Sequence, residues 1–138
     1  MRLCLDTGLL MRGVEGIPEV RAAVVQILRR AEQSAGGGIV ASQLARAECL
    51  VMPIREHNTA RYQEFLDFFA ESGIEMINVT AEILAMATAI RAHQGLKMID
   101  AIQVATAQIT NCEILLTTDA GIVKRGPYGN VRVEHFPP

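Results

Sequence analysis

Short apolar runs alternate with longer helical patterns along the chain, and this alternation limits the fold more than any other feature. Apolar residues recur at helical spacing between most of these runs. A strand buried on both faces reads as a continuous apolar run, so the runs favour a mainly parallel sheet. The sequence therefore predicts an α/β domain with about four or five strands. The expected strands lie within Arg2–Gly8, Ile39–Ala41, Glu75–Val79, Glu113–Asp119 and Val131–Phe136, the last at an edge.

Capping residues and glycines set the expected limits of the helices. Ser42 and Thr80 are suitable N-caps. Gly13 and Gly16 are expected to break the segment after the first strand, and Pro53 to kink or end the helix that follows Ser42. Helices are expected from Pro18 through Ala31, after Ser42, over Tyr62–Phe69, from Thr80 through Ile90 and over Lys97–Thr110. The face of Tyr62–Phe69 is typical of core or of a subunit interface.

Composition predicts one soluble domain over residues 1–138. Half of the 138 residues are hydrophobic, but no apolar run reaches the ~18 residues of a membrane span. The first residues lack the layout of a signal peptide, so a cytoplasmic protein without membrane contact is expected. Cys4, Cys49 and Cys112 lie in apolar contexts without a C-x-x-C spacing, which predicts small core residues. The net charge of −2 neither indicates nor excludes nucleic-acid binding.

Four acidic residues stand where apolar or neutral residues are expected. Asp6 and Asp119 end buried strands, while Glu48 and Asp100 lie in the apolar stripes of two expected helices. Each acid alone has an ordinary explanation, such as a helix cap or a turn. Burying an unpaired carboxylate costs several kcal/mol or more, however, so such groups are protonated, paired or bound to a cation.

One α/β domain can gather these four carboxylates at one edge of its sheet, because ligands bind at the carboxyl ends of parallel strands. Clustered carboxylates repel one another unless a positive charge neutralises them. Oxygen ligands without His or Cys favour Mg²⁺ or Mn²⁺, which commonly act on phosphates. The residues alone thus predict a Mg²⁺- or Mn²⁺-dependent phosphodiesterase or phosphotransferase.

The order of the acidic motifs resembles the PIN domain, and the compact length resembles the VapC toxins of type II toxin–antitoxin systems. The motifs are Asp6-Thr7, Ser42 followed six residues later by Glu48, Asp100-Ala101, and Thr117-Thr118-Asp119. The segment Arg46–Arg55 is also similar to the Glu-bearing helix of one VapC subset. The resemblance covers essentially the whole chain and implies a PIN-like three-layer α/β/α domain.

The resemblance implies a metal-dependent endoribonuclease toxin, often a homodimer, that is inhibited by a VapB-type antitoxin. By position, Asp6 and Asp100 would be the main metal ligands, with Glu48 and Asp119 completing the acidic pocket directly or through water. The metal would be Mg²⁺ or Mn²⁺, and RNA the substrate.

Three other residues receive roles by the same resemblance. Thr7 and Thr118 would supply hydroxyls that orient carboxylates or the attacking water. Arg46 would pair with an acid or touch a substrate phosphate, although an exposed helix arginine is an alternative. Gly8 departs from the pattern, because these proteins commonly have a small polar residue such as Asn or Ser at that position.

Two other functions share part of this pattern. Phosphotransfer of the haloacid-dehalogenase type also begins with Asp after the first strand, but it needs a second Asp two residues later, where this chain has Gly8. A non-catalytic PIN-like module that binds RNA or a protein partner would be expected to lack one of the acids, and none is missing.

Overall fold

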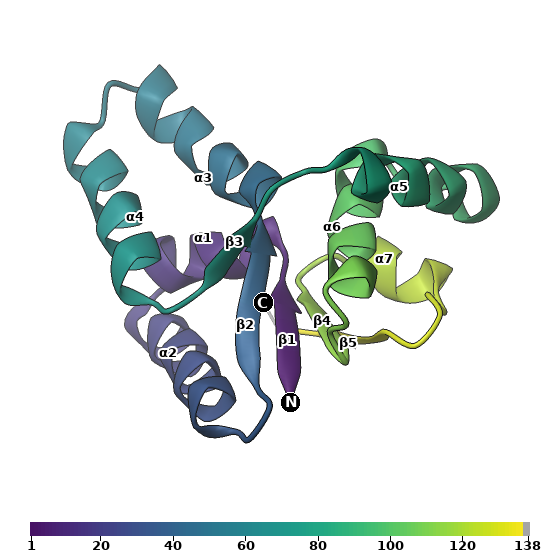
Figure 1. Cartoon of the computed structure of the whole chain (residues 1–138). Helices are drawn as coiled ribbons and strands as arrows, with labels where there is room; N and C mark the ends of the chain where they lie inside the picture. Colours follow the sequence, from purple (N-terminus) through teal and green to yellow (C-terminus); the bar gives the residue numbers. More distant parts are fainter. Residues whose placement is uncertain (137–138) are drawn as a thin grey trace.

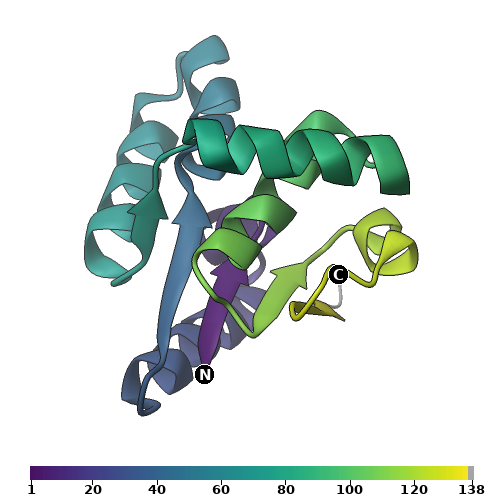
Figure 2. The ribbon, with the colours of Figure 1, turned by 45° about the vertical axis from the view of Figure 1, so that its right-hand side comes forward.

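The computed structural model describes residues 1–136 and contains a five-stranded sheet with helices on both faces. The strand order is β3-β2-β1-β4-β5, and every neighbouring pair is parallel. Figure 2 shows the arrows of β2, β1 and β4 pointing the same way. The predicted three-layer, mainly parallel fold is confirmed. The strands are β1 (Arg2–Leu5), β2 (Gly38–Ser42), β3 (Glu75–Ile77), β4 (Ile114–Thr117) and β5 (Arg132–His135).

The described residues also form seven helices, and these divide between the two faces of the sheet (Figure 1). Helices α1 to α4 pack on one face around Leu5, Ala41 and Leu116, while α5 to α7 pack on the other around Cys4 and Leu115. Neighbouring strand residues therefore contribute to opposite cores, as strand geometry requires. The helices are α1 (Thr7–Glu15), α2 (Pro18–Gln33), α3 (Gln43–Arg55), α4 (Thr59–Glu71), α5 (Ala81–Gln94), α6 (Met98–Ile109) and α7 (Ala120–Arg125).

Several predictions from local sequence are confirmed. Ser42 caps α3 by accepting from the backbone N–H of Leu44, and Thr80 caps α5 by accepting from Ile83. Gly95 ends α5 in the left-handed conformation, with φ of 72°. The three cysteines are buried and free. The aromatic face of α4 belongs to the core, since Phe65 is fully buried and Phe69 is 9% exposed. No helix among the described residues is long and apolar enough to cross a membrane.

The first helix is the main correction to the sequence-based prediction. Gly13 and Gly16 are predicted to break this segment, but α1 begins directly after Asp6, includes Gly13 and ends only at Gly16, which is its C-cap. A Cβ at Gly13 would lie 2.6 Å from the Phe68 ring, so this glycine permits close packing of α1 against α4. The predicted end at Pro53 is also early, because α3 continues to Arg55. Proline lacks one N–H, and the last turn of a helix tolerates that loss better than its middle.

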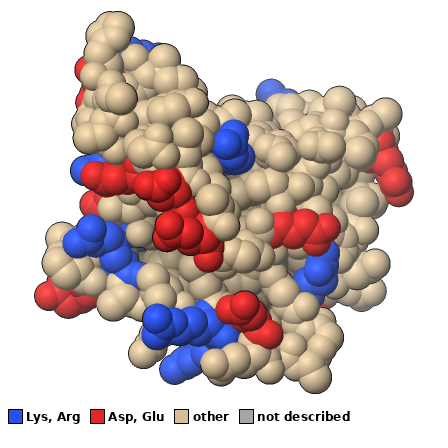
Figure 3. Space-filling model, turned by 60° about the vertical axis from the view of Figure 1, so that its left-hand side comes forward, with Lys and Arg blue, Asp and Glu red and all other residues tan. Residues whose placement is uncertain are grey.

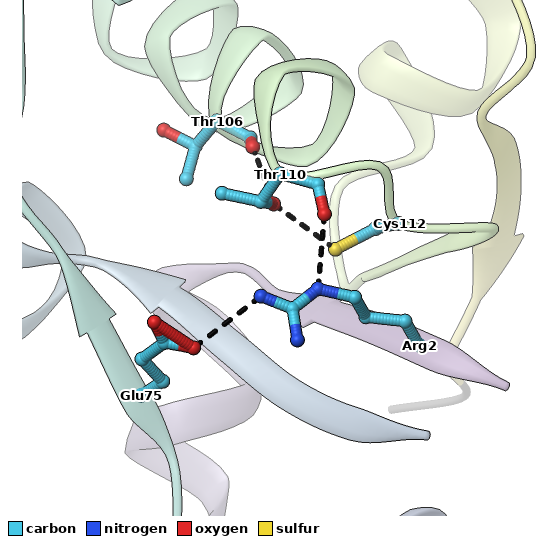
Figure 4. A network of polar contacts seen from close by, with 5 residues as sticks. All are labelled: Arg2, Glu75, Thr106, Thr110 and Cys112. Atoms are coloured by element: carbon cyan, nitrogen blue, oxygen red, sulfur yellow. Dashed lines mark hydrogen bonds and ion pairs between the residues drawn. The ribbon is translucent and has the colours of Figure 1, made fainter. Parts of the chain in front are cut away.

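A polar network closes the amino ends of the strands (Figure 4). The Arg2 side chain donates from Nε to the carbonyl oxygen of Thr110 at 2.9 Å and forms an ion pair with Glu75 at 3.3 Å. The Thr110 hydroxyl in turn contacts the carbonyl oxygen of Thr106 and Sγ of Cys112. These contacts connect the starts of β1 and β3 with the end of α6.

Candidate active site

The carboxyl ends of β1 and β4 bring Asp6 and the segment Thr117–Asp119 together. The two strands are parallel neighbours, with Leu5 opposite Leu116. The backbone N–H of Asp6 donates to the carbonyl oxygen of Leu116 at 3.1 Å. Two predicted acids therefore leave the sheet side by side, because parallel strands end at the same edge.

The Asp6 carboxylate is held on both oxygens. Its Oδ1 accepts from the backbone N–H of Leu9 at 3.0 Å, which caps α1. Its Oδ2 accepts from the Thr117 hydroxyl and from the backbone N–H of Thr118, the latter at 3.2 Å. Only 3% of the Asp6 surface is exposed, so these hydrogen bonds lie almost entirely out of contact with solvent.

Glu48 reaches the same region from α3 through Thr7. The Thr7 hydroxyl donates to Oε1 of Glu48 at 2.7 Å. Gln103 of α6 contacts the same threonine twice, since its Oε1 accepts from the Thr7 N–H at 3.0 Å and its Nε2 donates to the Thr7 hydroxyl at 3.2 Å. The predicted role of Thr7 as a hydroxyl that orients a carboxylate thus has a geometric basis.

Asp100 lies half-buried in the first turn of α6. Burial raises the pKa of its carboxyl group most, followed by repulsion from Asp119. Asp6 and Glu48 raise that pKa further, whereas the charge of Lys97 lowers it. The pKa of Asp6 is raised by burial, with a smaller contribution from Asp119, against the opposing effect of its hydrogen bonds. The charges of the other three predicted acids therefore all act on Asp100, and the charge of Asp119 also acts on Asp6.

Asp119 is both a helix cap and a member of the acidic group. It caps α7, because its Oδ1 accepts from the backbone N–H of Gly121 at 2.7 Å. It is also exposed, and its charge raises the pKa of both Asp6 and Asp100. Asp119 therefore caps α7 and also belongs to the acidic group. It is the member of that group that lies exposed to solvent.

The side chains of Arg46 and Thr118, two other predicted site residues, contact Phe69 and Gly8. The guanidinium carbon of Arg46 lies 5.3 Å from the centre of the Phe69 ring, a cation–π contact with α4. The Thr118 hydroxyl lies above Gly8, where a Cβ at residue 8 would come within 2.0 Å of it. The Thr118 side chain thus fills the space that a side chain at residue 8 would need, and residue 8 is the position that departs from the family pattern.

Sequence reasoning missed two polar residues of the site, Thr117 and Gln103. The hydroxyl that binds Asp6 belongs to Thr117, which also accepts from the backbone N–H of Asp119 at 2.9 Å. Both residues are buried, and Gln103 follows Asp100 by three positions in the same helix. Its place in an otherwise apolar stripe was the signal that could have identified it.

The chemistry of the donor set fits a hard divalent cation. It offers only carboxylate oxygens, and these repel one another, so a cation would relieve a penalty that the fold imposes. Within residues 1–136, no group of three or more His, Cys, Asp and Glu side chains is arranged so that it could hold a metal ion. One or two carboxylates with water satisfy Mg²⁺, however, so the ion does not require a closed protein cage.

A comparison with protein families identifies the fold by sequence. The profile of the PIN domain matches residues 3–126. The chain belongs to the PIN domain family. PIN-domain toxins are nucleases, which supports a nuclease here, and the resemblance drawn from the ordered acids is confirmed. A search of curated proteins found no match.

Solved structures similar to this PIN domain include toxins and toxin–antitoxin complexes. A toxin–antitoxin complex from Klebsiella pneumoniae contains a chain 25% identical, with a TM-score of 0.67 and coverage of 94% of this chain and 95% of that one. VapBC2 from Rickettsia felis, bound to a promoter DNA fragment, contains a chain 18% identical, with a TM-score of 0.75 and coverage of 98% of both chains. VapC20 from Mycobacterium tuberculosis, a toxin that cleaves the sarcin–ricin loop, is 16% identical, with a TM-score of 0.66 and coverage of 94% of this chain and 98% of that one.

Proposed function

We propose that this PIN domain is a Mg²⁺- or Mn²⁺-dependent endoribonuclease and the toxin of a type II toxin–antitoxin pair. The observation that carries the proposal is the gathering of acids at one edge of the sheet, where Asp119, Asp6 and Glu48 all raise the pKa of Asp100 and Asp119 also raises that of Asp6. A fold that holds like charges together without a compensating cation loses stability, so such clusters are typical of functional sites. The similarity to VapC20, a toxin that cleaves the sarcin–ricin loop, supports RNA as the substrate class.

The four acids have distinct tasks in this proposal. Asp6 and Asp100 are the main ligands, with Glu48 and Asp119 completing the site directly or through water. A bound divalent ion lowers the pKa of water and stabilises negative charge at phosphorus. The hydrogen bonds to Asp6 from Thr117 and Thr118 hold its carboxylate in one orientation, in which it would bind the ion.

The test is cleavage of a mixed pool of structured RNAs by purified protein in Mn²⁺ or Mg²⁺. EDTA and the Asp100→Asn variant are the parallel controls. We expect discrete cuts that both controls abolish, because each removes a part of the proposed site. Folded, metal-bound and antitoxin-free wild-type protein that cuts no RNA would instead favour a PIN-like module that binds RNA or a protein without cleavage.

A VapB-type antitoxin is the proposed protein partner, and both would act in the cytoplasm. Complexes of toxin with antitoxin among the similar structures support this proposal. Acidic and basic side chains stand in neighbouring patches on the side formed by α2, α3 and α4 (Figure 3). A groove there is lined by Arg21 and Arg29 of α2 and by Glu64 and Asp67 of α4. Mixed charge suits a protein segment better than an RNA backbone, which favours a basic surface.

We also propose a homodimer, with α3 as part of its interface. Val51, Met52 and Ile54 of this helix are 46%, 43% and 60% exposed. Neighbouring exposed apolar side chains are typical of protein interfaces. Ile54→Asp should therefore convert the dimer into monomer in light scattering after size exclusion. Ile17→Asp, which changes an equally exposed isoleucine before α2, is the matched control and should leave the dimer intact. A wild-type monomer would contradict the proposal.

A further inference from the structure

We propose that Gln103 is a positioning residue of the acidic site, which holds Thr7 so that the Thr7 hydroxyl points its proton at Glu48. This inference rests on the nuclease function proposed above and adds a residue that the acidic motifs do not include. It concerns one buried amide, one hydroxyl and one carboxylate on three different helices.

The contacts of Gln103 fix both the backbone and the side chain of Thr7. Oε1 of Gln103 accepts from the backbone N–H of Thr7 at 3.0 Å, and its Nε2 donates to the Thr7 hydroxyl at 3.2 Å. A backbone N–H can only donate, so the amide oxygen must face it. The orientation of the Gln103 amide therefore follows from its partners, and Nε2 must face the hydroxyl.

The direction of the Thr7 proton follows from the same contacts. A hydroxyl has a single proton to donate, and its oxygen already accepts from Gln103. The proton is therefore free for Oε1 of Glu48, which lies 2.7 Å away. Hydrogen bonds to a carboxylate are roughly twice as strong as neutral ones, so Glu48 is restrained by this contact.

Burial makes this arrangement specific. Gln103 is 3% exposed, and a buried amide must find partners within the protein. Its partners lie on the segment that immediately follows Asp6, while Gln103 itself stands one turn after Asp100. Gln103 thereby connects the elements that bear three of the four acids: the start of α1, α3 and α6.

The experiment measures binding of Mn²⁺ alone by calorimetry, well below the unfolding midpoint of each variant. Gln103→Met keeps the shape of the side chain but removes both contacts with Thr7. We expect its dissociation constant for Mn²⁺ to rise about tenfold or more, as when partners that orient ligands are removed. Gln108→Met is the matched control, since Gln108 lies further along the same helix and its Oε1 has no hydrogen-bond partner. This control should bind Mn²⁺ as the wild type does.

A double-mutant cycle separates positioning from a general loss of packing. Thr7→Val removes the hydroxyl through which Gln103 acts. Adding Gln103→Met to Thr7→Val should therefore change the Mn²⁺ affinity by less than about twofold, the usual margin of additivity. If Gln103→Met does not fold, Gln103→Asn replaces it, because the shorter amide cannot reach Thr7.

The outcomes distinguish this inference from the proposed function. Wild-type protein that binds Mn²⁺ and cuts RNA, with Gln103→Met or Gln103→Asn equal to it in affinity, would overturn the role of Gln103 alone. The same conclusion would follow if the double variant lost Mn²⁺ affinity by the product of the two single losses. Wild-type protein that neither binds Mn²⁺ nor cuts RNA would overturn the proposed function, and the role of Gln103 with it.

Discussion

Metal-free protein should become more stable when Asp100 is replaced by asparagine, although cleavage should fall at least about a hundredfold. Burial and the charges of Asp119, Asp6 and Glu48 all act against an ionised Asp100. The amide carries no charge, so the repulsion disappears. For a half-exposed group, solvent screening limits the gain to about 0.5–1 kcal/mol. This gain corresponds to about 1–3 °C in the unfolding midpoint.

The loss of activity has a different cause, because Asp100 is a proposed metal ligand. Removing a residue that merely orients a ligand commonly costs 10- to 100-fold in affinity or activity, so removing the ligand should cost more. Thermal unfolding in EDTA and then in Mn²⁺ tests both effects. Mn²⁺ should raise the midpoint of the wild type above that of Asp100→Asn, since the ion binds only the folded protein.

Glu113→Gln is the control for this comparison. Glu113 is exposed and precedes β4, at the edge of the sheet opposite the acids. Its replacement should change neither the midpoint in EDTA nor the response to Mn²⁺. An Asp100→Asn protein less stable than wild type in EDTA would show that favourable contacts outweigh the repulsion. An undiminished response to Mn²⁺ would remove Asp100 from the ligands.

The strands of the sheet could be predicted because each one is recognised from a short run of neighbouring residues. Apolar runs such as Ile114–Thr117 are buried on both faces, and this pattern is visible without knowing the neighbours. In a parallel sheet, the carboxyl ends of the strands that precede Asp6 and Asp119 lie at the same edge. The neighbourhood of these acids thus followed from topology alone.

The helix α1 could not be predicted in the same way, because its decisive contact is distant in sequence. Gly13 reads as a helix breaker when only its neighbours are known. In the structure it faces Phe68, more than fifty residues later, and the missing side chain is what allows α1 and α4 to pack closely. The tertiary contact therefore outweighs the low helix propensity of glycine.

The details of the site were also beyond local patterns. Thr117 and Thr118 are adjacent hydroxyl residues, and only the geometry at the end of β4 decides which one binds Asp6. Gln103 could be recognised as a misplaced polar residue, but its partner Thr7 lies 96 positions earlier. Residue types and spacing thus indicated the acids, while their supporting hydrogen bonds required the fold.

Gly8→Ala should destabilise the protein, although alanine is the better helix former. A Cβ at this position would lie 2.0 Å from Oγ1 of Thr118 and 3.1 Å from its Cβ and Cγ2, so the Thr118 side chain must move. Overpacking of this kind costs about 1–3 kcal/mol, against a gain of up to about 1 kcal/mol from helix propensity. Cleavage should fall as well, because the backbone N–H of Thr118 binds Asp6 and Asp119 follows directly.

Thr118→Ala should reverse the sign of this effect. Alanine at 118 removes Oγ1 and Cγ2 and leaves only the Cβ–Cβ approach of 3.1 Å, which a shift of a few tenths of an ångström relieves. In that background Gly8→Ala should be neutral or stabilising, because the helix-propensity gain remains while most of the clash is gone. Chemical denaturation of the four proteins measures the coupling directly. Equal effects of Gly8→Ala in both backgrounds would mean that Thr118 does not determine the need for glycine. A coupling above about 1 kcal/mol would explain the departure from the family pattern at residue 8, because the Thr118 side chain fills the space that a side chain at residue 8 would need.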